Sequence, residues 1–158
     1  MRLFFHKWLD TILAIVVWQL VSLPIHELGH EIGARLAGLP AGYATYNLSL
    51  WQGRHNLPRG TEASDFQTVI WFAGGGVFTA LLTGLLWWRA RTTPTRWDLN
   101  HEMALAMVWV GEAAYAVGEA TRWEYKGWLS LVATLGAMVY YIPQVWRWLE
   151  AQNGHESG

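Results

Sequence analysis

The chain has 158 residues, of which 53% are hydrophobic and 15% are charged, and its formal net charge is −1. Soluble domains carry about 25% charged residues, so the composition favours a single integral membrane domain. The 12 Trp residues suit the boundary between lipid and water. Because 11 Lys and Arg are balanced by 12 Asp and Glu, a nucleic-acid partner is not expected. The absence of Cys excludes disulfides, thiolate metal sites and cysteine nucleophiles.

Four segments are apolar enough to be membrane-spanning helices, which need about 20 residues each. They lie at about 8–37, 66–88, 103–121 and 128–148, and the first is expected to end at Gly38 and Pro40. No small-residue cleavage site follows the first segment, so we do not interpret it as a signal peptide. Basic residues are similarly distributed on both sides, so the positive-inside rule assigns no orientation. We therefore predict an all-α, multi-pass protein of the cell membrane, embedded in the lipid bilayer.

The longest polar connection is the loop at 38–64, between the first two spans. From Tyr43 to Trp51, polar and apolar residues alternate, which predicts a short interfacial strand or hairpin. His55 in this loop, like His6 and His155, lies outside the spans and is expected to be solvated.

The sequence His26-Glu27-Leu28-Gly29-His30 lies within the first span. Positions four apart share one face of a helix, so both imidazoles can bind a single ion. Glu27 is placed to act as a general base on water bound to that ion. Imidazole and carboxylate ligands suit Zn2+, and three protein ligands leave one position open.

The polar cluster in this span needs an energetic explanation. A charged residue at the centre of a membrane helix costs on the order of 3 kcal/mol, and a bound cation would offset that cost. In the alternative interpretation, the first helix ends near Pro24 and the cluster is a polar cap at the membrane surface. Glu31 and Arg35 are four residues apart and are expected to form a surface ion pair.

A third metal ligand must come from another segment, and Glu112 and Glu119 in the third span are the candidates. At 1.5 Å per residue, the histidine pair lies roughly 12–18 Å below the membrane surface and Glu112 about 16 Å below it. Depth therefore favours Glu112. Glu119 becomes competitive if the helix continues to Lys126, or it could support another ligand. Without a metal, these carboxylates would form interhelical hydrogen bonds.

Gly74, Gly75 and Gly76 lie consecutively in the second span. Three glycines cost a helix roughly 3 kcal/mol relative to alanine, so a compensating role is expected. They would allow another helix to approach closely, and loosened amides could bind the substrate.

These motifs resemble those of the site-2 protease family of intramembrane zinc metalloproteases. The resemblance covers about residues 8–122 and includes the HExxH helix, the loop with strand character, Ala-Gly-Gly at 73–75 and an acidic residue in the third span; the fourth span is unmatched. It implies that His26 and His30 bind zinc, that Glu27 activates water and that the substrate is a membrane protein or peptide. It favours Glu119 as third ligand, because Gly-Glu-Ala around Glu119 is most similar to the family's Asp-Gly motif. The strand around 43–51 would then offer an edge to an unwound substrate.

The sequence is also compatible with three other functions. The protein could be a non-catalytic subunit that associates with other membrane subunits, or a metal-binding relative of the site-2 proteases without proteolytic activity. A di-iron redox protein is less favoured: Glu27 and His30 form one Glu-x-x-His pair, but no other helix has a second.

Overall fold

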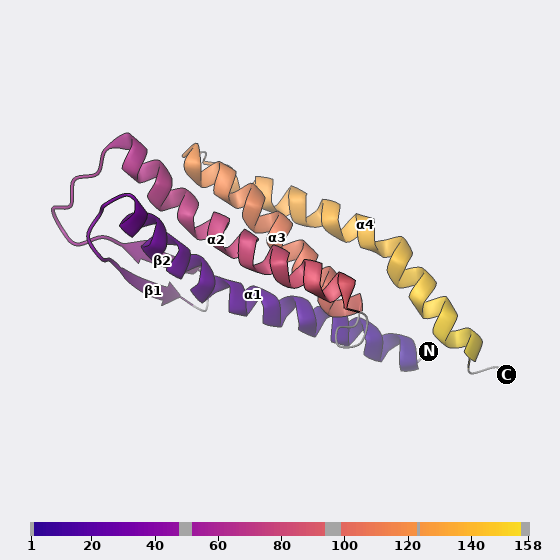
Figure 1. The fold of residues 1–158 in the computed structure, drawn as a ribbon. Helices are drawn as coiled ribbons and strands as arrows, with labels where there is room; N and C mark the ends of the chain where they lie inside the picture. The colour runs from indigo at the N-terminus through magenta and orange to yellow at the C-terminus, as the bar shows by residue number, and fades with distance from the viewer. Residues whose placement is uncertain (1, 48–51, 94–98, 123, 156–158) are drawn as a thin grey trace.

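The computed structural model describes residues 2–47, 52–93, 99–122 and 124–155. Its four helices are α1 (Arg2–Leu36), α2 (Asp65–Thr92), α3 (Leu99–Ala120) and α4 (Lys126–His155). They lie side by side in an elongated bundle, with the hairpin of β1 (Tyr43–Asn47) and β2 (Gln52–Asn56) beside the C-terminal half of α1 (Figure 1). The helical class and the hairpin between the first two helices are confirmed. Both termini lie at the same end of the bundle (Figure 1).

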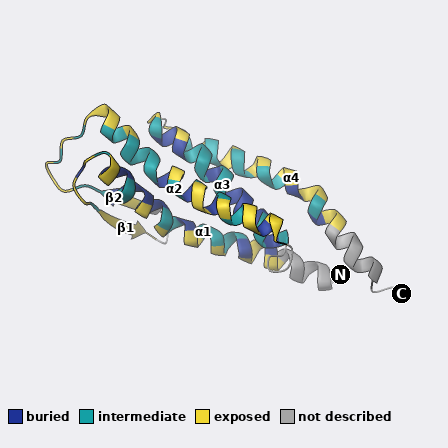
Figure 2. Cartoon of the chain, in the orientation of Figure 1, coloured by how far each residue is buried: buried dark blue, intermediate teal, exposed yellow. Residues whose placement is uncertain are grey.

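Three helices in the described part of the chain are long and apolar enough to cross a membrane. These candidate spans are Leu9–Leu36, Asp65–Thr92 and Lys126–Arg147. Large apolar side chains on their outer faces, such as Leu13, Leu81 and Val132, are exposed, as expected of a surface that contacts lipid. The helix α3 has a different surface: Ala104, Leu105 and Val108 are at most 1% exposed. It forms much of the buried interior (Figure 2).

The ends of α1 and α2 follow from local sequence. Gly38 has φ +74°, a conformation that glycine adopts without steric cost, and the amide of Leu39 donates to the carbonyl of Ala34 at 2.8 Å. This ends α1 where the sequence predicts. Pro24 does not end it, so the interpretation with a short first helix is wrong. Ser64 and Gln67 form a reciprocal capping box at the start of α2.

The consecutive glycines allow close packing of the helix backbones. A Cβ at Gly74 would lie 2.5 Å from the carbonyl oxygen of Gly29 on α1. A Cβ at Gly76 would lie 2.7 Å from the carbonyl oxygen of Glu112 on α3. The small-residue packing prediction is therefore confirmed. Because α2 is an unbroken helix here, loosened amides are not observed, and contact of Gly74, Gly75 and Gly76 with a substrate stays a prediction.

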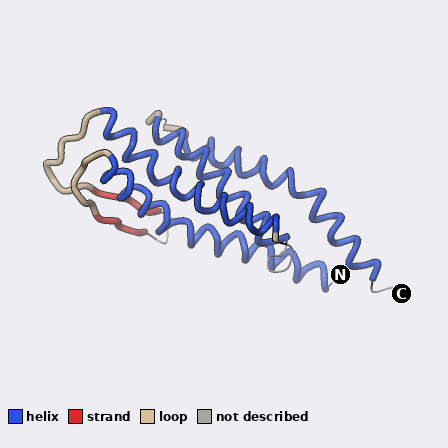
Figure 3. Tube along the Cα trace, in the orientation of Figure 1, coloured by secondary structure: helices blue, strands red, loops and turns tan. Residues whose placement is uncertain are grey.

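The hairpin differs in detail from the sequence prediction. The first strand ends at Asn47, residues 48–51 lie outside the described residues, and the second strand is Gln52–Asn56. The two strands lie side by side (Figure 3). They are antiparallel, with Thr45 opposite Arg54. Every residue of β1 is exposed, whereas β2 contacts α1 more extensively. The strand that borders the bundle is therefore β2. Only its partner β1 lies within the predicted 43–51 segment, and β2 itself follows that segment.

Candidate metal centre

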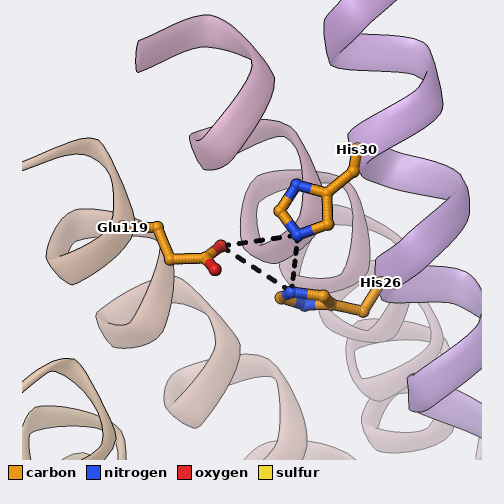
Figure 4. A group of neighbouring side chains, drawn as sticks. All are labelled: His26, His30 and Glu119. Atoms are coloured by element: carbon orange, nitrogen blue, oxygen red, sulfur yellow. Dashed lines mark hydrogen bonds and ion pairs between the residues drawn. The ribbon is translucent and has the colours of Figure 1, made fainter. Parts of the chain in front are cut away.

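His26 and His30 lie one turn apart on α1 and face each other (Figure 4). Their rings are nearly perpendicular, at 82°, and the two Nε2 atoms are 3.1 Å apart. Both residues are buried, with 9% and 6% of their surface exposed. The helical spacing therefore directs the same nitrogen of each ring toward one point, as the HExxH pattern predicts.

The other ring nitrogens determine where the protons lie. His30 Nδ1 is 2.9 Å from the backbone carbonyl oxygen of Trp71, which can only accept a hydrogen bond. His26 Nδ1 is 2.8 Å from Glu112 Oε2, and an ionised carboxylate also only accepts. Each Nδ1 therefore carries a hydrogen, and in the neutral rings each Nε2 presents a lone pair.

Glu119 brings a third electron-pair donor to the same point. Its Oε2 lies 3.7 Å from His26 Nε2 and 3.8 Å from His30 Nε2 (Figure 4). This oxygen is buried and has no hydrogen-bond partner among the described residues. Two lone pairs at 3.1 Å repel each other unless a cation lies between them, either a proton on one ring or a metal ion.

The donor set fits a tetrahedral metal ion. Ligand atoms of such an ion, with bonds of 2.0–2.1 Å, lie about 3.3–3.4 Å apart. The three separations among His26 Nε2, His30 Nε2 and Glu119 Oε2 are 3.1, 3.7 and 3.8 Å, which bracket that spacing. Two imidazoles and one carboxylate are ligands that Zn2+ accepts. These three residues could therefore hold a metal.

The two candidate carboxylates contact the histidines in different ways. Glu112 contacts Nδ1 of His26, on the outer side of the ring, whereas Glu119 faces the inner Nε2 atoms. The geometry favours Glu119 as the third ligand. Glu112 instead orients the His26 ring through its Nδ1 atom. Depth in the membrane favours Glu112, which does lie at the level of His26. Depth alone does not determine which ring nitrogen Glu112 contacts.

Glu27 lines the same cavity as the histidines, with a volume of about 770 Å³. Its side chain is buried, and its Oε2 accepts no hydrogen bond within the described ranges. A Cβ at Gly53 would overlap the Glu27 carboxylate, so the backbone of β2 lies directly on this side chain. The hairpin therefore limits where the candidate general base can move.

Gly75 is the glycine of α2 that faces the histidines. A Cβ at this position would lie 2.6 Å from His30 Nε2 and 2.7 Å from His26 Nε2. Any side chain at Gly75 would therefore displace both rings. The run of three glycines indicated close contacts here, but the sequence did not show that one of them lies against the candidate ligands.

His55 is buried, so the prediction that it is solvated is wrong. The indole N–H of Trp71 donates to its Nδ1 at 2.9 Å, and its Nε2 is 3.0 Å from Glu31 Oε2. Because an indole only donates, His55 Nδ1 is the acceptor and Nε2 carries the hydrogen that bonds to Glu31. The predicted Glu31–Arg35 ion pair is confirmed at 2.6 Å. Glu31 also accepts a hydrogen bond from the amide of Gly42, just before β1. It therefore connects the open end of the hairpin to α1 through both Gly42 and His55.

Lys126 is a site residue that the sequence does not predict. Its Nζ lies 3.1 Å from Glu119 Oε1, and it lines the cavity with Ser130, also on α4. No sequence motif marks either residue.

Comparison of the chain with protein-family models, with curated proteins and with solved structures finds no match. The resemblance to the site-2 proteases therefore depends on the short motifs alone, and a function must be argued from the chemistry of the site.

Proposed function

We propose that the protein is an intramembrane zinc metalloprotease of the cell membrane that hydrolyses peptide bonds in membrane-spanning or membrane-associated substrates. His26, His30 and Glu119 would hold Zn2+. The supporting observation is that two Nε2 lone pairs and one buried carboxylate oxygen converge at the wall of a polar cavity. Structural metal sites are closed, whereas a catalytic site has three protein ligands and an open position.

The residues around the proposed zinc site have different roles in the reaction. When bound, Zn2+ would polarise the substrate carbonyl and make a coordinated water more acidic. Glu27 takes the proton of the attacking water and passes it to the leaving amine nitrogen. The Glu112 carboxylate and the Trp71 carbonyl hold the Nδ1 hydrogens of His26 and His30, so both Nε2 lone pairs stay directed at the ion.

The hairpin supports a role in substrate binding. The consecutive residues Gly53, Arg54, His55 and Asn56 all line the cavity. Since successive side chains of a strand point to opposite faces, this run indicates that an edge of β2 borders the cavity. An unwound substrate that added to this edge would satisfy its backbone groups beside Glu27. N-methylation of substrate amides near the scissile bond should raise KM without altering metal content; an unchanged KM would contradict this mode of binding.

Metal analysis and cleavage assays on the detergent-purified chain test the function. We expect one zinc per chain, lost in His26→Ala and retained in the matched control His101→Ala. Glu27→Gln should keep its zinc and fail to cleave a membrane-spanning peptide that the unmodified chain cleaves. A chain without zinc would refute the proposal and favour a non-catalytic subunit, and two irons per chain would favour a redox protein. Zinc without cleavage of any membrane peptide would leave a metal-binding protein lacking protease activity.

We also infer that α3 is a fourth membrane crossing. With 22 residues it is about 33 Å long, which matches the roughly 30 Å of bilayer hydrocarbon, and it packs along both α2 and α4. Because the chain has no Cys, single cysteines at Gly60, Thr93 and Glu124 can be labelled without background. Four crossings put Gly60 and Glu124 on one side of the membrane and Thr93 on the other. Labelling of Thr93 and Glu124 from the same side would show that α3 does not cross.

A further inference from the structure

We propose that Lys126 is a positioning residue that keeps Glu119 bound to the metal through a single oxygen. This inference depends on the proposed metal centre and adds the fourth helix to it. The two oxygens of the Glu119 carboxylate have different neighbours: Oε1 lies 3.1 Å from Lys126 Nζ, and Oε2 faces His26 and His30. One oxygen is thus paired with an ammonium group and the other is directed to the metal position.

Backbone packing fixes where the Lys126 side chain can reach. A Cβ at Gly118 would overlap the Cβ of Lys126 and lie 2.9 Å from its Cα, so the start of α4 lies directly against α3 beside Glu119. The turn between these helices contains Arg122 in the left-handed region, with φ 53°. The ammonium group also lies 5.0 Å from the centroid of the Tyr115 ring, one helical turn before Glu119. Lys126 is therefore held between two side chains of α3.

The consequence for the metal concerns the number of ligand atoms. Glu119 is buried, and without Lys126 its Oε1 would have no cation beside it in the described part of the site. Such a carboxylate would turn to bind the ion through both oxygens. Bidentate binding would add a second Glu119 oxygen to the two imidazoles, the first oxygen and the water in the open position, so the ion would have five ligand atoms instead of four. The pairing with Lys126 would keep the number of ligand atoms at four and would also balance the charge of Glu119 before the metal binds.

Cobalt substitution tests this role on the full chain in detergent. Four-coordinate Co2+ absorbs visible light more strongly than five-coordinate Co2+, so the band reports the number of ligands directly. We expect a strong band in the unmodified chain and a weaker band, at equal cobalt content, in Lys126→Met. We also expect metal affinity to fall by about 10- to 100-fold, as for other residues that orient metal ligands. Lys126→Arg should restore the band.

Control variants distinguish the positioning role of Lys126 from a loss of folding and from the absence of a metal centre. Arg122→Gln removes a neighbouring cation that pairs with Asp65 at 3.0 Å, and it should leave the spectrum unchanged. If Lys126→Met does not fold, Lys126→Gln decides the question, because it keeps a long polar side chain and removes the ammonium charge beside Glu119. An unchanged band and affinity in these variants would overturn the role of Lys126 alone. Failure of the unmodified chain to bind Zn2+ or Co2+ would instead refute the metal centre itself.

Discussion

The contact between Gly75 and the two imidazoles predicts that Gly75→Ala disturbs metal binding while the fold is retained. Ordinary carbon contacts begin at 3.4 Å, whereas the added Cβ would lie 2.6 Å from His30 Nε2 and 2.7 Å from His26 Nε2. Each nitrogen would therefore have to retreat by about 0.7–0.8 Å, several times the roughly 0.2 Å tolerance of a metal–ligand bond. The atoms that must move are side-chain atoms, so the backbone can stay in place.

The expected loss is about 100-fold in zinc affinity, which corresponds to about 2.7 kcal/mol. Chelator competition on the purified chain would measure the affinity, and thermal unfolding after removal of the metal would measure stability. Alanine is favoured over glycine inside a helix by about 0.5–1 kcal/mol, so the metal-free variant should not be destabilised.

Gly84→Ala is the matched control in the same helix. A Cβ at Gly84 would lie 3.9 Å from its nearest neighbour in the Trp109 side chain, which is an ordinary contact. It should have the same effect on helix propensity and no effect on zinc affinity. If Gly75→Ala binds zinc as tightly as Gly84→Ala, the proposal that His26 and His30 share one ion through their Nε2 atoms is refuted.

Three further substitutions test the surroundings of the site. Glu112→Gln keeps a hydrogen-bond acceptor for His26 Nδ1 but removes the negative charge, so zinc affinity should fall about 10-fold in a chelator titration. An unchanged zinc affinity would show that Glu112 does not orient the His26 ring. Gly53→Ala would push the Glu27 carboxylate aside and should lower kcat about 100-fold with zinc content intact, and a normal kcat would argue against Glu27 as the base. Gly74→Val would force α1 and α2 apart and should reduce the free energy of unfolding by about 1–3 kcal/mol, measured by thermal unfolding; full stability would contradict the close backbone packing.

The sequence predicts the helices well because long apolar runs and local end signals are properties of single segments. Gly38 ends α1 and Ser64 begins α2 through bonds to residues a few positions away. The histidine pair is predictable for the same reason, since one helical turn sets its geometry. Depth in the membrane can also be counted along a helix. It gives no information about the angle from which another helix approaches.

The parts that the sequence does not predict depend on contacts between distant segments. The burial of His55 requires Glu31 on α1 and Trp71 on α2 to meet the same ring, with sequence separations of 24 and 16 residues. The contact of Lys126 with Glu119 requires a tight turn and a glycine at position 118. None of these contacts produces a periodic pattern, so the sequence predicts neither the burial of His55 nor the contact of Lys126 with Glu119.

If α3 crosses the membrane as proposed, its burial among the other helices has a consequence for how it is inserted. The helix α3 contains three carboxylates, Glu102, Glu112 and Glu119, and among the described helices it is the one outside the candidate membrane spans, so it is the least able to insert by itself. Chains emerge from the ribosome with the N-terminus first, so α1 and α2 are already available when α3 is synthesised. The imidazole of His26 can then form its hydrogen bond with Glu112 as α3 inserts into the membrane. Biogenesis of this protein would thus depend on earlier helices acting as a polar template for a later one.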